Sequence, residues 1–243
     1  MFFRFTRSPL CHNLACTSQR FTATSSPSET NPKLVVITAL GNPPDQYANT
    51  RHNAGHVIFD SLIPQLVEKN TALLKNKWRN KSYSLSYFLS PKPQNETAKT
   101  SIQYMFVKVD GCFMNLSGQV LLPFWKSSVI TDWQKSNRAG EIQHIVVHDE
   151  LEKPLGECQW RKFGTSAKGH NGLRSIDSCN ASAKKGHSSG VVYSKIGIGI
   201  DRPPKGEDIA NYVLSRFSRV ELETLQRKTV PNAFKLLKIH GLA

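Results

Sequence analysis

The sequence has 243 residues, of which 39% are hydrophobic and 9% aromatic, so it can bury a sizeable core and does not resemble a disordered chain. No stretch reaches the roughly 18 consecutive apolar residues that a membrane-spanning helix requires, which argues against a membrane protein of that kind. The net charge of +14, from 32 basic and 18 acidic side chains, favours a polyanionic partner such as nucleic acid. A basic organelle protein or a solubilising surface would carry the same charge, so charge alone does not decide the function.

The first 32 residues differ in composition from the rest of the chain. They carry Arg4, Arg7 and Arg20 among many Ser and Thr, with no acidic residue before Glu29. Such Arg-rich, Ser-rich and acid-poor leaders are typical of mitochondrial transit peptides, and a disordered cytosolic tail is the alternative. We therefore predict a leader over residues 1–32 and one folded domain over residues 33–243, in the mitochondrion or, on the alternative, in the cytoplasm.

The five cysteines favour a reducing compartment. They form no C-x-x-C pair, and their odd number argues against a disulfide framework. His and Cys nowhere show the spacing of zinc ligands, so we expect neither a metal ion nor another cofactor.

Apolar runs alternate with segments of helical periodicity along the first half of the chain. Residues 34–40 predict a strand that is buried on both faces and ends in the turn 41–44. Residues 53–70 predict a helix that Pro64 kinks or ends. Residues 76–100 are polar and loosely alternating, which predicts an edge strand followed by a loop.

The second half continues the same alternation. A helix with Ser117 as its N-cap is predicted over 117–130, and the tail from residue 206 predicts two helical segments, the second broken near Pro231. Strands that alternate with helices predict an α/β fold with a mostly parallel sheet covered on both faces. Three further strands are predicted at residues 105–109, 144–147 and 191–200.

Polar residues follow the predicted strands, at the sheet edge where ligands gather in α/β folds. Asn42 follows the first strand, Phe113-Met114-Asn115 the second, and His148-Asp149 the third, while Gly169-His170-Asn171 opens a later helix. We therefore expect separate loops to bring amides, an imidazole and a carboxylate to one rim.

His52 lies directly before the predicted helix, where an imidazole can face a cleft and titrate near neutral pH. If Asp149 accepts a hydrogen bond from one ring nitrogen, the other nitrogen is left basic and can take a proton from water. The chain has no G-x-S-x-G nucleophile motif, so water is the expected attacking group, oriented by Asn42, Asn115 and Asn171. For a lone histidine, a surface or capping role is the alternative.

A basic stretch from Arg161 to Lys205 contains nine basic and two acidic side chains, a net charge of +7. Such a stretch can neutralise phosphates and bring affinity and salt dependence with little sequence selectivity. A solvated face is the alternative for Lys184 and Lys185, which lie in a Ser- and Gly-rich segment.

Taken together, these motifs make the chain resemble a known family, the bacterial-type peptidyl-tRNA hydrolases. We expect a mitochondrial form of that family. Five segments occur in the family's order and cover nearly all of the chain after residue 33. They are LGNPPDQYANTRHNAG (40–55), FMNLSG (113–118), VVHDEL (146–151), GHNGLRSI (169–176) and IGIGIDRP (196–203).

The resemblance implies a single compact domain, with a mixed β-sheet sandwiched by α-helices, that hydrolyses the peptidyl-tRNA ester without a metal. It implies that His52 is the general base, supported by Asp149 and Asn42, and that the acceptor stem and 3′ end of tRNA are bound by a monomer, without a membrane. The implied substrate-binding residues are Tyr47, Phe113, Met114, Asn115, His170 and Asn171, and the implied tRNA phosphate contacts are Lys162 and Lys195.

Three features depart from the family pattern. The loop 164–169 replaces a glycine-richer loop, residues 180–190 resemble an insertion, and Pro44 stands where a glycine is usual. None of them removes a chemical group, so activity stays the expectation. The alternatives are a non-catalytic RNA-binding relative that acts in RNA processing, and a general small-ester hydrolase that is indifferent to tRNA and salt.

Overall fold

The computed structural model describes residues 32–68, 71, 73–91, 102–136, 140–185 and 190–243. Within these ranges the chain builds a single seven-stranded sheet of order β2-β3-β4-β1-β5-β7-β6. The predicted leader lies outside the described residues, apart from Pro32. No helix in the described part of the chain has both the length and the apolar character to span a bilayer.

Four parallel strands form the centre of the sheet. β1 (Lys33–Ala39) lies between β4 (Ile102–Gly111) and β5 (Glu141–Glu150), and β7 (Tyr193–Gly199) pairs with the far side of β5. These strands are rich in Val and Ile because helices cover both of their faces. The carboxyl ends of β1, β4 and β5 therefore meet at one edge of the sheet.

Antiparallel strands close the sheet on both sides. β2 (Leu74–Arg79) and β3 (Ser84–Leu89) form a hairpin next to β4, and β6 (Cys158–Arg161) pairs with β7. The mixed, mostly parallel sheet is thus confirmed. The prediction of one edge strand within 76–100 was wrong in detail, because a turn at residues 80–83 folds the segment into two strands.

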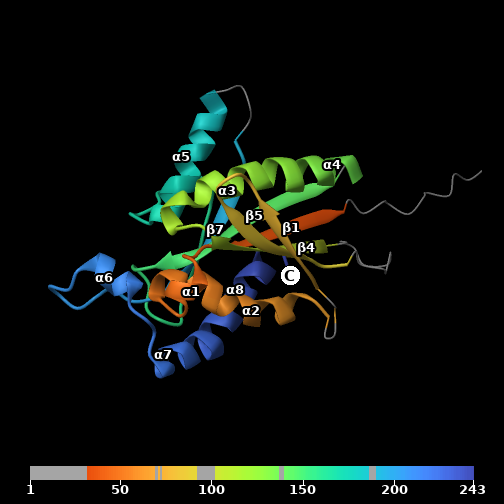
Figure 1. Ribbon diagram of the computed structural model, residues 1–243. Helices are drawn as coiled ribbons and strands as arrows, with labels where there is room; N and C mark the ends of the chain where they lie inside the picture. The colour runs from red at the N-terminus through yellow and green to blue at the C-terminus, as the bar shows by residue number, and fades with distance from the viewer. Residues whose placement is uncertain (1–31, 69–70, 72, 92–101, 137–139, 186–189) are drawn as a thin grey trace, which may run out of the picture.

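Helices cover the two faces of the sheet (Figure 1). On one face α3 (Ser117–Phe124), the π-helical segment Trp125–Thr131 and α4 (Asp132–Ser136) form one long rod, and α5 (Asn171–Lys185) packs on α3. Alternate residues of β1 serve the two layers, with Leu34 and Val36 in one hydrophobic cluster and Val35 and Ile37 in the other. The opposite face carries α2 (Ala54–Leu66), α7 (Arg219–Thr224), the π-helical segment Leu225–Thr229 and α8 (Val230–Ile239).

The helix limits differ from the predictions at three places. α2 ends at Leu66, and Pro64 lies inside its last turn, where its missing N–H removes only one intrahelical hydrogen bond. Ser117 is not the N-cap of α3: Leu116 holds that position, and the Ser117 hydroxyl donates to the Met114 carbonyl over 2.8 Å. The rod that begins at Ser117 runs on to Ser136 instead of ending at 130.

The predicted break near Pro231 is absent. α7 and α8 join through the π-helical segment, which ends immediately before α8, and Pro231 stands in the first turn of α8. A wider helical turn is compatible with a proline, because proline cannot donate the regular backbone hydrogen bond.

Candidate active site

A cleft of about 780 Å³ opens at the carboxyl edge of the parallel strands. Loops after β1 and β4, the end of β5 and the start of α5 supply its floor, and α6 (Ile209–Leu214) supplies one wall. The expected convergence of separate loops is therefore confirmed. Nine of the eleven site residues expected from the sequence line this cleft: Asn42, Tyr47, His52, Phe113, Met114, Asn115, Asp149, His170 and Asn171.

His52 and Asp149 form a direct pair in this cleft. His52 lies in the short 3₁₀ helix Arg51–Asn53, and its Nδ1 lies 2.8 Å from Oδ1 of Asp149. Both side chains are buried, and Asp149 is part of β5, not of a loop after the strand as the sequence had indicated. Because Nδ1 donates to the carboxylate, Nε2 is left with the lone pair of a base.

The interaction between the two side chains raises the pKa of His52 and lowers that of Asp149. Burial lowers the pKa of His52, but the charge of Asp149 and its hydrogen bond outweigh this and leave the pKa raised above 6.5. Burial would raise the pKa of Asp149, but His52 and His170 hold it well below its usual range. The carboxyl group therefore stays ionised and favours the imidazolium form of His52.

His170 contacts the same carboxylate oxygen from the other side. Its Nε2 lies 2.9 Å from Oδ1 of Asp149, and its Nδ1 accepts from the backbone amides of Gly172 and Leu173 at 3.1 and 3.3 Å. Since those amides are donors, Nδ1 is the acceptor and Nε2 carries the hydrogen. His170 thus caps the start of α5 and orients Asp149 at the same time.

Asn42 is held so that its amino group, which has no hydrogen-bond partner among the described residues, can serve the cleft. Its Oδ1 accepts from the Met114 amide over 2.8 Å, which assigns Nδ2 as the group that remains for a ligand. Asn53 fixes the Asn42 backbone, accepting from its N–H over 2.8 Å and donating to its carbonyl over 3.0 Å. Asn53 was not predicted from the sequence, because side-chain to backbone pairing across eleven residues leaves no pattern in a sequence.

A close approach of α2 to the sheet places His52 beside Asp149. A Cβ at Gly55 would lie 2.9 Å from the Val147 carbonyl and 3.0 Å from the Leu40 carbonyl, closer than normal contact. Glycine therefore lets the first turn of α2, and with it the preceding 3₁₀ helix, lie against the ends of β1 and β5.

The remaining predicted substrate residues surround the pair. Asn115 and Asn171 are exposed at the cleft, so both carboxamides are accessible to a ligand. The Tyr47 and Phe113 rings pack edge to face with centroids 6.3 Å apart, and Phe113 is 49% exposed. Together with Met114 they form an apolar side of the cleft.

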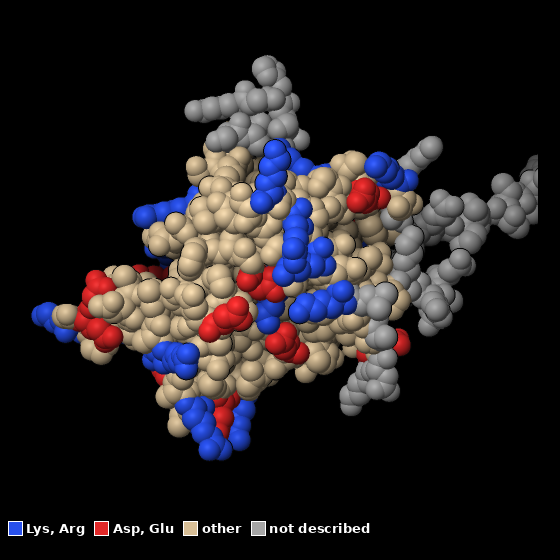
Figure 2. Space-filling model, in the orientation of Figure 1, with Lys and Arg blue, Asp and Glu red and all other residues tan. Residues whose placement is uncertain are grey.

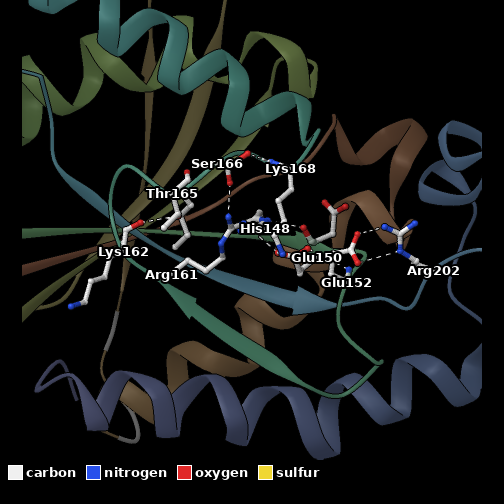
Figure 3. Close-up of polar contacts among 11 residues, drawn as sticks. His148, Glu150, Glu152, Arg161, Lys162, Thr165, Ser166, Lys168 and Arg202 are labelled. Carbon is white, nitrogen blue, oxygen red and sulfur yellow. Dashed lines mark hydrogen bonds and ion pairs between the residues drawn. The ribbon is translucent and has the colours of Figure 1, made fainter.

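Lys162 and Lys195 do not line the cleft. Lys162 is exposed and points away from the neighbouring ion pairs (Figure 3). Lys195 is only 1% exposed, and its Nζ donates to the Thr165 carbonyl over 2.5 Å. In this arrangement Lys195 cannot contact a phosphate, and its expected role would require Thr165 to move away.

The rim is not uniformly basic, as the charge of the segment 161–205 had suggested. Four carboxylates line the cleft, those of Asp149, Glu150, Glu152 and Asp208, against the two cations Lys168 and Arg202. Figure 2 shows the same mixture on one face, where acidic side chains lie among Lys and Arg. Of these residues only Asp149 was predicted as part of the site, because the net charge of a segment does not reveal how its charges pair.

His52, Asp149 and His170 also have the composition of a metal site, with donor atoms all within 4.8 Å of one another. Both histidines, however, point a ring nitrogen at one oxygen, at hydrogen-bond distances of 2.8 and 2.9 Å. As arranged, these atoms serve one another as donors and acceptor, which fits a base and its support.

Comparisons with known proteins show the family to which the chain belongs. The family model described as "Peptidyl-tRNA hydrolase" matches residues 36–240. The peptidyl-tRNA hydrolase of Sulfurovum sp. is 31% identical over 86% of this chain and 92% of its own length, and that of Saccharomyces cerevisiae is 30% identical over 84% and 94%. The crystal structure of peptidyl-tRNA hydrolase from Acinetobacter baumannii shares the fold, with a TM-score of 0.54 and 23% identity over 88% of this chain and 90% of that one. With most of its length matched by the family model, the chain belongs to the peptidyl-tRNA hydrolase family.

Proposed function

We propose that this protein hydrolyses the ester bond of peptidyl-tRNA and releases a free peptide and a free tRNA. The observation that carries the proposal is the 2.8 Å contact of His52 Nδ1 with Asp149, in a cleft where Asn42 presents an amide. Family membership gives the substrate class, and the site supplies the groups that ester hydrolysis needs.

His52 acts as the general base in this proposal. Its Nε2 takes a proton from water as the water oxygen attacks the ester carbonyl, and Asp149 stabilises the imidazolium that forms. The tetrahedral intermediate then collapses, and the imidazolium returns the proton to the 3′-oxygen of the terminal adenosine as it leaves. A positioned base of this kind contributes roughly 10²- to 10⁴-fold to the rate.

Side-chain amides in the cleft stabilise the negative charge that develops on the carbonyl oxygen. Asn42 Nδ2 is the candidate donor to that oxyanion, since its own carbonyl is already engaged by Met114. Asn115 and Asn171 position the substrate, and the apolar side with Tyr47, Phe113 and Met114 holds the peptide and the 3′ end. None of these steps is routed through a metal ion.

Two lysines outside the cleft bind the tRNA in this proposal. Lys162 contacts tRNA phosphate near the acceptor end, and Lys195 does so after Thr165 has moved. The protein acts as a monomer, as the resemblance to the family implies. Its location in the mitochondrion rests on the composition of the leader.

The test is to incubate the purified protein, without added metal, with N-acetylated aminoacyl-tRNA and with the same aminoacyl-tRNA unblocked. Release from the blocked substrate alone is expected, also in the presence of a chelator. Binding of tRNA without release would favour the non-catalytic relative instead. Equal release from a small ester without tRNA, insensitive to salt, would favour a general esterase.

A further inference from the structure

Two of the cleft carboxylates, those of Glu150 and Glu152, are paired with three cations, of which Lys168 and Arg202 line the cleft. Glu150 and Glu152 lie at and after the end of β5, and they face Arg161, Lys168 and Arg202 (Figure 3). Two carboxylates are paired with three cations. One cation can therefore leave while each carboxylate keeps a cationic partner.

Two of the cations already donate hydrogen bonds to protein oxygens. Arg202 reaches both carboxylate oxygens of Glu152, through Nε over 3.2 Å and through Nη2. Arg161 is almost buried, with Nη1 3.4 Å from Glu150 Oε2 and Nη2 donating to the Ser166 carbonyl over 2.6 Å. Neither can turn to a ligand without losing a hydrogen bond.

Lys168 differs from both. Its side chain is 40% exposed, whereas that of Glu150 is only 4% exposed, and its Nζ lies 3.6 Å from Glu150 Oε2, beyond hydrogen-bond distance. If the ammonium leaves, Arg161 still neutralises the buried carboxylate, and the Glu152 amide still donates to it over 3.3 Å. Of the two cations that line the cleft, Lys168 therefore gives up the weaker interaction when it binds an anion.

Lys168 adopts a backbone conformation that is unfavourable for a residue with a side chain, which indicates a functional role for that side chain. Its φ is 45°, in the left-handed region that glycine adopts without steric cost. The turn is held by the bond from Lys168 N–H to Ser166 Oγ at 3.1 Å and by that from His170 N–H to the Ala167 carbonyl at 2.9 Å. The main chain is thus fixed, two residues before the histidine that bonds Asp149, while the long side chain can swing.

We propose that Lys168 binds the last internucleotide phosphate of the tRNA, the one attached to the ribose that carries the scissile ester. This inference rests on the proposed function. That phosphate enters a cleft lined by four carboxylates, so its binding requires a cation close to the catalytic pair. On binding, Lys168 exchanges its long ion pair with Glu150 for a charge-assisted hydrogen bond to phosphate.

Two small substrates test this assignment. One is an N-acetylaminoacyl ester of adenosine, which has no phosphate, and the other is the same ester of cytidylyl-(3′→5′)-adenosine, which has one. The wild-type protein is expected to favour the second by about tenfold in kcat/KM at low salt, the size of one charge-assisted hydrogen bond. Lys168→Met should abolish that preference and leave the adenosine ester unaffected, and Lys168→Arg should restore most of it.

The matched control is Lys135→Met on α4. Lys135 makes an equally loose ion pair, 3.7 Å from Asp132, and its loss changes the net charge by the same amount. It should leave both esters unaffected. Lys168→Gly, which removes the cation and suits the left-handed backbone, should behave like Lys168→Met and so separates charge from backbone strain.

The salt dependence of kcat/KM on N-acetylaminoacyl-tRNA supplies a second measurement. Lys168→Met should reduce the slope of log(kcat/KM) against log[salt] by about 0.7–0.9, one phosphate contact, and Lys135→Met should not. A wild-type slope in Lys168→Met, or an equal loss on both esters, would overturn the assignment. If the wild-type protein cleaves no blocked substrate at all, the proposed function fails instead.

Discussion

In the proposed mechanism the His52–Asp149 pair is the smallest unit that performs the chemistry. Burial of the imidazole opposes its protonation, and the adjacent carboxylate overcomes that effect and raises the pKa above 6.5. A base with a raised pKa loses activity as the pH falls through that pKa, because the protonated ring cannot accept another proton. The acid limb of the pH–rate profile therefore reports on Asp149.

Asp149→Asn tests this dependence. The substitution removes the negative charge that raises the His52 pKa and leaves at most a hydrogen bond to a neutral amide oxygen, while burial still lowers the pKa, so the acid limb of kcat/KM should move to lower pH. The rate should fall by about 10²- to 10⁴-fold, since the orientation and tautomer of the ring are no longer fixed. The measurement is kcat/KM on N-acetylaminoacyl-tRNA from pH 5 to 9, with Asp132→Asn on α4 as the control. An acid limb that stays in place would show that Asp149 does not set the pKa of the base.

Much of the site could be predicted at the residue scale. Asn42, His52 and Asp149 stand at or near the ends of apolar runs, and the edge rule for parallel strands brings such positions together. The contact of His170 with the same oxygen of Asp149, and the two bonds of Asn53 to Asn42, depend on ring and amide orientations. Periodicity carries no information on those orientations, so only coordinates reveal them.

At the scale of elements, the packing of α3 on α5 positions the second half of the site. A Cβ at Gly118 would overlap the Ser175 carbonyl, and the Gly118 amide donates to Ser175 Oγ over 3.0 Å. α5 begins directly after His170, so its placement fixes that side chain and Asn171 in the cleft.

Gly118→Ala should therefore affect both stability and activity. The added methyl group forces α5 away from α3, which should lower the free energy of unfolding by about 1–3 kcal/mol and reduce kcat/KM as well. Urea unfolding and the hydrolysis assay measure the two effects. Gln119→Ala, at the exposed neighbouring position, is the control and should change neither. A stable, fully active Gly118→Ala protein would contradict the close packing.

The elements themselves were predictable where burial imposes a strong pattern. The central strands contain apolar runs, and the described structure has a strand at each of them; β1 and β7 lie close to the predicted limits, while β4 and β5 extend two to three residues beyond the predicted limits at each end. One strand was predicted within 76–100, where the structure has the two strands of the hairpin β2–β3, and the short strand β6 was not predicted. The edge strands β2 and β6 carry polar residues that interrupt the alternation.

At the scale of the whole molecule, three buried histidines link stability to pH. Burial lowers the pKa of His56, His144 and His148 from 6.5 to about 3, and neighbouring charges of Lys108 and His170 act in the same direction at His56 and His148. Each histidine binds a proton more readily in the unfolded chain. Their contributions are therefore complete above pH 6.5 and are lost as the pH falls toward 3. His52, whose pKa is raised, acts in the opposite direction.

The free energy of unfolding should fall below pH 6.5, by at most about 1.4 kcal/mol per pH unit for each such histidine. His144 is the residue to change, because both ring nitrogens lack a hydrogen-bond partner among the described residues and the ring packs 4.8 Å from Trp125. His144→Phe should reduce the pH dependence of the free energy of unfolding by the contribution of one histidine. Urea titrations at pH 7.5, 6 and 5 measure this change. An unchanged slope would mean that His144 does not titrate on unfolding.

The most direct test of the account is single-turnover hydrolysis of N-acetylaminoacyl-tRNA by His52→Ala, together with its affinity for the same substrate. If His52 is the base, the rate should fall by about 10²- to 10⁴-fold while the dissociation constant stays at the wild-type value. Wild-type turnover by this variant would contradict the assignment, whatever its affinity for tRNA.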